Sequence, residues 1–214
     1  MDNSKLVIFD FDGTIADTLE AAISVLDELA EEGKIKPYSK SDLLRWRKMD
    51  PKAVLKETGL SWWQVPLLLI SGRNRLKKHA KSTTIFEGMK LALQEVAQTY
   101  PWVVISTNSH RFISEVFELH GITGFGEING GGGLFGKHRR IKQVMKKYKL
   151  DPSNVVLVTD EIRDLEAAKK CDIHCITITW GYQDRETILN RNPEYCIDSP
   201  QELPLMINKI FRTE

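Results

Sequence analysis

A short apolar run that ends in two carboxylates constrains this chain more than any other feature. In KLVIFDFDGTIADT, residues 6–9 are apolar, and Asp10 and Asp12 follow at once. A run this short, bounded by charge and glycine, predicts a fully buried strand of a parallel sheet. Ionised carboxylates held close together in a partly dry site repel one another. Because residues i and i+2 of an extended segment point the same way, we expect Asp10 and Asp12 to face one site, where they bind a cation or take part in chemistry.

Further short runs rich in β-branched residues alternate with helical patterns along the chain. The predicted strands are residues 6–10, 102–107, 154–159 and 173–179, with a weaker one at 195–198. Apolar residues at spacings of three and four predict helices between them, one of them running from Leu19 to a stop at Gly33. This alternation is typical of an α/β fold: a doubly wound, Rossmann-like parallel sheet with right-handed crossovers.

Residues 17–83 interrupt the alternation, because they contain no convincing strand. Asp50 followed by Pro51 has the pattern of a helix N-cap with proline at the first helical position. Residues 61–64 have the spacing of a capping box. A chain of 214 residues is long enough for one domain that carries a smaller insertion. We therefore expect an α/β catalytic core at 1–16 and 84–214, and an all-helical cap at 17–83 inserted after the first strand.

Polar residues end three of the predicted strands. Asp10 ends the first, residues 106–108 end the second, and Asp160 ends the third. Ligands of open α/β sheets bind outside the carboxyl ends of the strands, so these side chains are expected to converge. Asp164 adds a carboxylate and Lys137 a compensating positive charge. Several acids at one edge favour a hard cation such as Mg²⁺, which prefers oxygen ligands.

Together these residues resemble the four sequence motifs of the haloacid dehalogenase superfamily, in order and over nearly the whole chain. The first motif is matched by DFDGT at 10–14, and the second by Thr107 at the end of a hydrophobic strand. Lys137 matches the third, and Asp160 with Asp164 matches the fourth. The segment ITITWGY at 176–182 and a helical insertion after the first motif resemble the phosphoglycolate phosphatase-like branch.

The resemblance implies a role for each acid. Asp10 is the expected nucleophile, which forms an aspartyl-phosphate, and Asp12 is the expected general acid and base. Mg²⁺ is the implied cofactor, held by Asp10, the main-chain carbonyl of Asp12, and Asp160, with Asp164 in support.

The resemblance also implies how the phosphoryl group is bound. Thr107 and Lys137 are expected to hold its oxygens, where negative charge needs neutralising. Asn108 is a further substrate-binding candidate, acting through its backbone. The expected function is that of a Mg²⁺-dependent phosphatase acting on a small, phosphoglycolate-like phosphomonoester.

Two positions depart from the family pattern. Thr159 stands where the family usually has glycine, and Glu161 where it usually has a small hydroxylated residue. Two alternative functions remain open: a phosphomutase, which keeps both aspartates, and a weakly active regulatory or binding protein, for which Thr159 and Glu161 are the only support.

Composition limits the partners and the compartment. A formal net charge of +1 provides no overall field toward nucleic acid or an anionic membrane. The longest apolar stretch outside the strands, residues 65–70, contains Pro66 and is too short to span a bilayer. Because the N-terminus leads straight into the candidate site, we expect no cleavable signal peptide, and the three scattered cysteines indicate reduced thiols. We expect a cytoplasmic protein with a small-molecule partner; its oligomeric state is open.

Three other patterns have plainer explanations. GGGLFGK at 131–137 matches the opening of a nucleotide-binding P-loop, but His138 follows where a Ser or Thr hydroxyl is needed. The basic residues between Arg73 and Lys81 are expected to form a solvated helix face, or a rim that favours a second anionic group if they face the site. Trp46, Trp62 and Trp63 are expected to pack in the core of the insertion.

Overall fold

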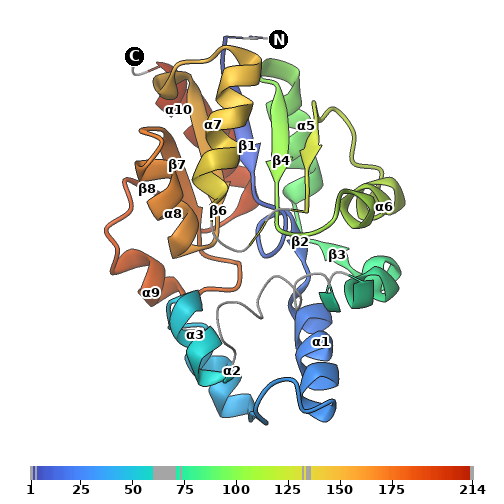
Figure 1. Cartoon of the computed structure of the whole chain (residues 1–214). Helices are drawn as coiled ribbons and strands as arrows, with labels where there is room; N and C mark the ends of the chain where they lie inside the picture. The colour runs from blue at the N-terminus through green and yellow to red at the C-terminus, as the bar shows by residue number, and fades with distance from the viewer. Residues whose placement is uncertain are drawn as a thin grey trace.

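The computed structural model describes residues 2, 4–59, 71–72, 74–131, 133 and 136–212. Within them, six strands form a parallel sheet in the order β5-β4-β1-β6-β7-β8, with helices on both faces (Figure 1). The strands are β1 (Leu6–Phe9), β4 (Trp102–Ile105), β5 (Ile128–Asn129), β6 (Val155–Thr159), β7 (His174–Ile178) and β8 (Tyr195–Ile197). The predicted fold class, a doubly wound Rossmann-like α/β sheet, is confirmed.

Alternation along β1 divides the core into two layers. Val7 and Phe9 pack with helices α5 (Met89–Thr99), α6 (His110–His120) and α10 (Leu203–Arg212). Leu6 and Ile8 pack on the opposite face with α7 (Lys137–Tyr148) and α8 (Ile162–Lys169). All four side chains are fully buried, because a central strand of a parallel sheet is covered on both sides. The described residues also include three short 3-10 helices and one short α-helix: η1 (Lys77–Ser82), η2 (Pro152–Asn154), α9 (Arg185–Leu189) and η3 (Pro200–Glu202).

The chain leaves the sheet after β1 and forms helices before it returns. These helices are α1 (Leu19–Glu31), α2 (Lys40–Trp46) and α3 (Pro51–Glu57), and in Figure 1 they lie beyond the end of the sheet to which β1 leads. Asp50 caps α3 by accepting a hydrogen bond from the backbone amide of Lys52, as predicted. Gly33 follows α1 in a left-handed conformation, which explains why the helix stops there.

Two short strands border this helical segment: β2 (Ala16–Asp17) pairs with β3 (Thr84–Ile85) in antiparallel fashion. The expectation that residues 17–83 contain no strand is therefore wrong at Asp17, the second residue of β2. Strands of two residues carry no periodicity, so the sequence pattern could not predict them. The same reason applies to β5, which adds to the edge of the sheet beside β4.

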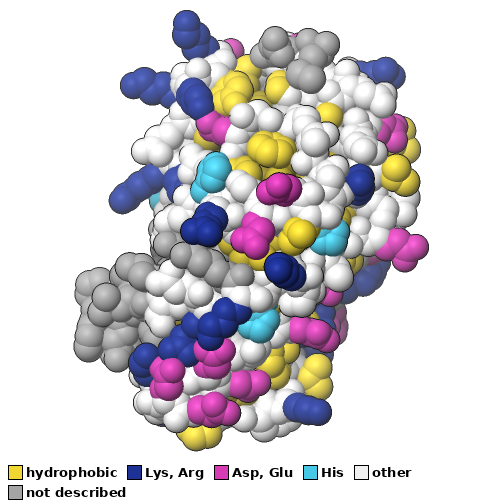
Figure 2. Space-filling model, turned by 90° about the vertical axis from the view of Figure 1, so that its right-hand side faces the viewer, with side chains coloured by type: hydrophobic (Ala, Val, Ile, Leu, Met, Phe, Trp, Pro, Cys, Tyr) yellow, Lys and Arg dark blue, Asp and Glu magenta, His cyan; other side chains and the backbone are white. Residues whose placement is uncertain are grey.

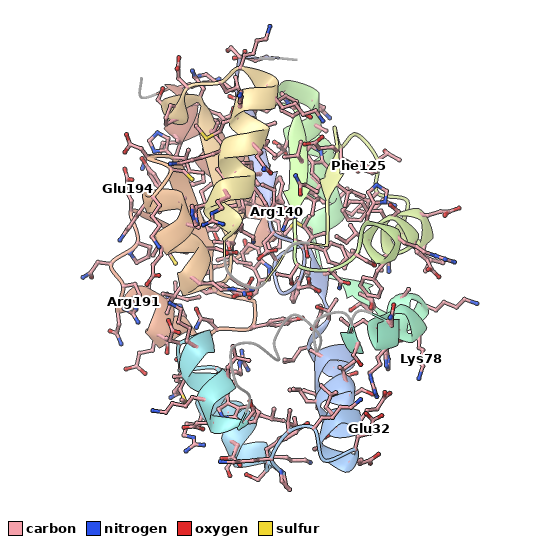
Figure 3. All side chains as sticks on the ribbon, in the orientation of Figure 1. Glu32, Lys78, Phe125, Arg140, Arg191 and Glu194 are labelled. Atoms are coloured by element: carbon pink, nitrogen blue, oxygen red, sulfur yellow. The ribbon has the colours of Figure 1, made fainter. Side chains whose placement is uncertain are left out.

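Basic residues near η1 form ion pairs within the helical segment. Arg75 forms ion pairs with Glu28 of α1 and with Glu32, the C-cap of that helix, at 2.5 and 2.8 Å. Lys78 and Glu32 lie on the same side of the molecule in Figure 3. Acidic and basic side chains are intermixed on this face in Figure 2, as a solvated helix face predicts. The predicted contribution of Arg73 lies outside the described residues.

Trp46 packs against Tyr38, with ring centroids 5.2 Å apart, inside the helical segment as predicted. Trp62, Trp63 and the predicted helix start at residue 61 lie outside the described residues. All three cysteines are described, and all are free thiols. No helix in the described part of the chain is both long and apolar enough to cross a bilayer.

Candidate active site

The parallel strands bring the predicted site residues to one edge of the sheet. Asp10 follows β1, Ser106 follows β4, and Asp160 follows β6, and β1 lies between the other two strands. Asp10, Ser106 and Asp160 are buried. The convergence expected from strand order is therefore present.

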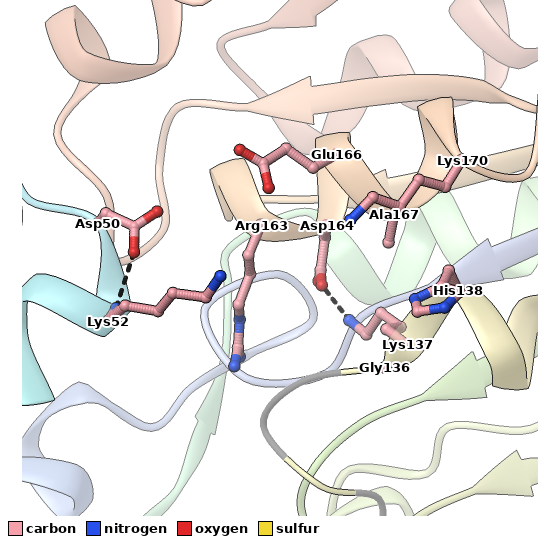
Figure 4. A pocket seen from close by; sticks show the side chains of 10 residues that line it. All are labelled: Asp50, Lys52, Gly136, Lys137, His138, Arg163, Asp164, Glu166, Ala167 and Lys170. Carbon is pink, nitrogen blue, oxygen red and sulfur yellow. Dashed lines mark hydrogen bonds and ion pairs between the residues drawn. The ribbon is translucent and has the colours of Figure 1, made fainter. Parts of the chain in front are cut away.

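Lys137 links two of the acids. Its Nζ lies 2.8 Å from Asp10 Oδ2 and also contacts the Asp164 carboxylate, which Figure 4 marks with a dashed line. Burial alone would lower the pKa of Lys137, but the two carboxylates outweigh it and raise that pKa. Burial raises the pKa of Asp10 despite this ion pair, and Lys137 together with Arg163 lowers the pKa of Asp164 against the effect of burial.

Asp12 has a different environment from Asp10. Its carboxylate accepts hydrogen bonds from Thr18 Oγ1 at 2.9 Å, Ser106 Oγ at 2.9 Å and Asn108 Nδ2 at 3.1 Å. All three donors are neutral. The two carboxylates therefore have unlike environments: Asp10 belongs to an ion cluster, whereas Asp12 is held by hydroxyl and amide groups.

The buried carboxylate of Asp160 is bound by one hydroxyl group and one backbone amide. Its carboxylate accepts hydrogen bonds from Thr14 Oγ1 at 2.9 Å and from the Tyr182 amide at 2.7 Å. A Cβ atom at Gly13 would lie 2.3 Å from Asp160 Oδ2, and one at Gly181 would lie 2.3 Å from its Cβ, so only glycine fits on either side. Burial, with a smaller contribution from Glu161, raises the pKa of Asp160 to about 7.

The two departures from the family pattern have local roles. Thr159 Oγ1 donates a hydrogen bond to Asp164 Oδ2 at 3.0 Å and accepts one from the Glu161 amide at 3.2 Å. The Glu161 carboxylate forms an ion pair with Arg163. Thr159 therefore helps to fix Asp164, and Glu161 is bound by its own neighbour.

The donor set fits a hard cation only in part. Among the described residues, no group of three or more His, Cys, Asp or Glu side chains has an arrangement that could hold a metal ion. Asp160, however, is a buried carboxylate whose observed hydrogen-bond donors are both neutral. Burying such a charge without a compensating partner is costly. Its oxygens, those of Asp10 and a main-chain carbonyl are the donor types that Mg²⁺ prefers.

The second-motif residues have unequal positions. Asn108 is buried, and its side chain donates a hydrogen bond to Asp12. From the sequence, we expected Asn108 to act through its backbone. Thr107 is half-buried and adjoins Ser106 directly after β4. Sequence reasoning assigned no role at the site to Thr14, Thr18 and Tyr182, and it placed Ser106 at the strand end without giving it a role. The hydroxyls of Thr14, Thr18 and Ser106 lie next to or inside the first two motifs, which was the available signal.

A pocket of about 180 Å³ lies beside this cluster (Figure 4). Lys137 and Asp164 line it from the sheet side, and Asp50 and Lys52 of the helical segment line it from the other. The Lys52 side chain in Figure 4 extends toward Arg163. The helical segment and the sheet thus enclose space next to the candidate ion cluster.

Comparison with known proteins identifies the family of this chain. The family model described as "Haloacid dehalogenase-like hydrolase" matches residues 7–178, which include every motif named above. The chain belongs to this family. The predicted family and the predicted enzyme class, a hydrolase of the haloacid dehalogenase type, are therefore confirmed.

Among curated members, the chain is similar to the phosphoglycolate phosphatase of Synechococcus elongatus, with 26% identity over 210 residues, 97% of this chain and 99% of that protein. The phosphoglycolate phosphatase of Vibrio cholerae is 25% identical over 218 residues, 92% of this chain and 94% of its own. Among solved structures, a protein from Clostridium acetobutylicum described as a predicted phosphatase gives a TM-score of 0.80 at 20% identity, covering 96% of this chain and 99% of its own. This structural likeness supports the family fold.

Proposed function

We propose that this member of the family is a Mg²⁺-dependent phosphatase that hydrolyses a small, phosphoglycolate-like phosphomonoester through an aspartyl-phosphate. The observation that carries the proposal is the difference between Asp10 and Asp12. Asp10 lies 2.8 Å from the Lys137 ammonium, whereas Asp12 has only neutral donors in its observed hydrogen bonds. Two carboxylates in unlike environments are suited to two different roles.

In the first step, a carboxylate oxygen of Asp10 attacks phosphorus and the bond from phosphorus to the alcohol oxygen breaks. Asp12 gives its proton to the departing alkoxide. In the second step, Asp12 takes a proton from water, whose oxygen attacks phosphorus. The bond from phosphorus to Asp10 then breaks, and inorganic phosphate leaves with both aspartates restored.

The surrounding residues neutralise and orient the phosphoryl group. Lys137 supplies a fixed positive charge next to Asp10, and Thr107 and Asn108 supply polar groups from the end of β4. The residues that would hold Mg²⁺ are Asp10, the main-chain carbonyl of Asp12, and Asp160, with Asp164 in support. When bound, the ion supplies further charge neutralisation for the phosphoryl oxygens.

We further propose that residues 17–83 act as a cap that selects the substrate, above a core formed by 1–16 and 84–214. The pocket between Lys137 and Lys52 supports this division, because the helical segment contributes part of its lining. The names of the Synechococcus and Vibrio relatives support a two-carbon phosphate ester as substrate.

A metabolite panel tests the proposal. Purified protein with Mg²⁺ should release phosphate from 2-phosphoglycolate and from p-nitrophenyl phosphate, and EDTA should abolish the release. Absence of phosphate release from every ester by folded protein would contradict the proposal. Interconversion of sugar-phosphate isomers without release would identify a phosphomutase instead.

A further inference from the structure

The loop at 181–184, which follows β7, contacts Asp160 directly and reaches Asp12 through one hydroxyl group. The Tyr182 hydroxyl contacts Thr18 Oγ1, and Thr18 Oγ1 donates to Asp12 Oδ1 at 2.9 Å. Because Thr18 uses its one proton on Asp12, its oxygen accepts the proton of Tyr182. The Tyr182 amide donates to Asp160 Oδ2 at 2.7 Å. One residue therefore contacts an acid directly and reaches another through a single hydroxyl.

The same loop is bound to the helical segment. Arg47, the C-cap of α2, donates from Nε to the Tyr182 carbonyl at 2.8 Å and from Nη2 to the Gly181 carbonyl at 3.3 Å. The Arg47 carbonyl in turn accepts a hydrogen bond from the Asp184 amide at 3.0 Å. Arg47 thus holds the backbone of Tyr182 on both sides.

Gln183 makes a second connection. Its side-chain amide donates to the Met49 carbonyl at 3.2 Å, and its Oε1 accepts from the Ile162 amide at 2.6 Å. Met49 belongs to the helical segment, and Ile162 begins α8, two residues after Asp160. Gln183 is buried. The loop is therefore fixed between the helical segment and the acids of the site.

We propose that Tyr182 is a positioning residue that orients Asp12 through Thr18, and that Arg47 keeps Tyr182 in this position. The proposal rests on the proposed function, since Asp12 must be the acid that protonates the leaving alcohol. A misplacement of about 1 Å can cost roughly 100-fold in rate. Asp12 follows the end of β1 and lies outside it, so its carboxylate depends on its hydrogen-bond donors for its orientation.

The test compares two leaving groups. Nitrophenolate departs without help from an acid, whereas the alkoxide of 2-phosphoglycolate needs a proton. In Tyr182→Phe, kcat/KM for 2-phosphoglycolate should fall roughly 10- to 100-fold. For p-nitrophenyl phosphate it should change by less than about threefold. Thr18→Val, which breaks the same connection at another residue, should give the same pattern, and Arg47→Met the same pattern in weaker form.

Matched controls come from the helical segment. Tyr38 donates its hydroxyl proton to Asp27 at 2.6 Å, and Arg45 forms ion pairs with Asp42 and Glu57. Tyr38→Phe and Arg45→Met should leave both kcat/KM values unchanged. Equal losses with both esters, or no loss in Tyr182→Phe and Thr18→Val, would overturn the inference while the phosphatase proposal stands. A wild-type protein that hydrolyses neither ester would contradict the proposed function itself.

Discussion

Lys137 Nζ lies 2.8 Å from Asp10 Oδ2, and the two side chains are only 7% and 5% exposed. The same ammonium contacts Asp164, whose side chain is 2% exposed. One buried cation therefore serves two buried carboxylates. Removing one member of such a cluster leaves uncompensated charge in a dry environment, which costs more than the pair itself contributes.

Lys137→Met should accordingly lower the free energy of unfolding by about 3–5 kcal/mol, as measured by urea denaturation. Lys147 on the same helix is the control, because its ion pair with Glu127 is exposed, with 61% of the Lys147 side chain accessible. Lys147→Met should leave the free energy of unfolding nearly unchanged, because solvent screens an exposed ion pair. Equal costs for the two variants would contradict the role of Lys137 in the cluster.

Thr159→Val should be destabilising, because it removes the hydroxyl that donates to Asp164 at 3.0 Å. A hydrogen bond to a charged group contributes about 1.5–3 kcal/mol. Thr177 pairs with Thr159 across β6 and β7 and donates to the neutral Tyr195 carbonyl at 3.0 Å. Thr177→Val should therefore cost less, about 0.5–1.5 kcal/mol. Urea denaturation of both variants tests this order, and a larger loss of unfolding free energy in Thr177→Val than in Thr159→Val would contradict it.

Gly13→Ala should damage both stability and activity. Gly13 and Gly33 have similar left-handed φ angles of 72° and 67°, but only at Gly13 does an added Cβ meet other atoms, at 2.3 Å from Asp160 Oδ2. Gly33→Ala should cost only the conformational strain, roughly 1–2 kcal/mol. Gly13→Ala should exceed it by about 1–3 kcal/mol because of overpacking. Thermal unfolding and phosphate release test the pair, and retained activity in Gly13→Ala would show that Asp160 is not constrained as described.

The three thiols should react at different rates. Burial raises the pKa of Cys171 and Cys175, and both side chains are buried, whereas Cys196 is half-buried. Since the thiolate is the reactive form, a thiol-specific reagent should modify Cys196 first. Cys171 and Cys175 should react only after unfolding in urea. Mass spectrometry of the labelled peptides gives the order, and early labelling of Cys175 would contradict it.

Much of this arrangement could be predicted from local sequence. The five predicted strands are present because each is a short contiguous run of strand-forming residues. Asp50 caps α3 because its side chain and Pro51 suit that position. The convergence of Asp10 and Asp160 followed from strand ends alone. These features depend on residues close together in the chain.

Backbone turns at the end of a strand and contacts between distant residues could not be predicted in this way. The expectation that Asp10 and Asp12 point the same way assumes an extended backbone. However, β1 ends at Phe9, and Gly13 turns the chain with a φ of 72°. The contact of Thr18 with Tyr182 joins residues 164 positions apart. No periodicity carries that information, because only the packed fold brings the two hydroxyls together.

In the proposed mechanism, Asp10 carries the phosphoryl group, and Asp12 donates and accepts the protons. Rapid acid quench of the protein with 2-phosphoglycolate and Mg²⁺, followed by peptide mass spectrometry, tests it most directly. One added phosphoryl group is expected on the peptide that contains Asp10, and none in Asp10→Asn. Turnover without any phosphorylated peptide, or an unchanged rate of phosphate release in Asp10→Asn, would contradict it.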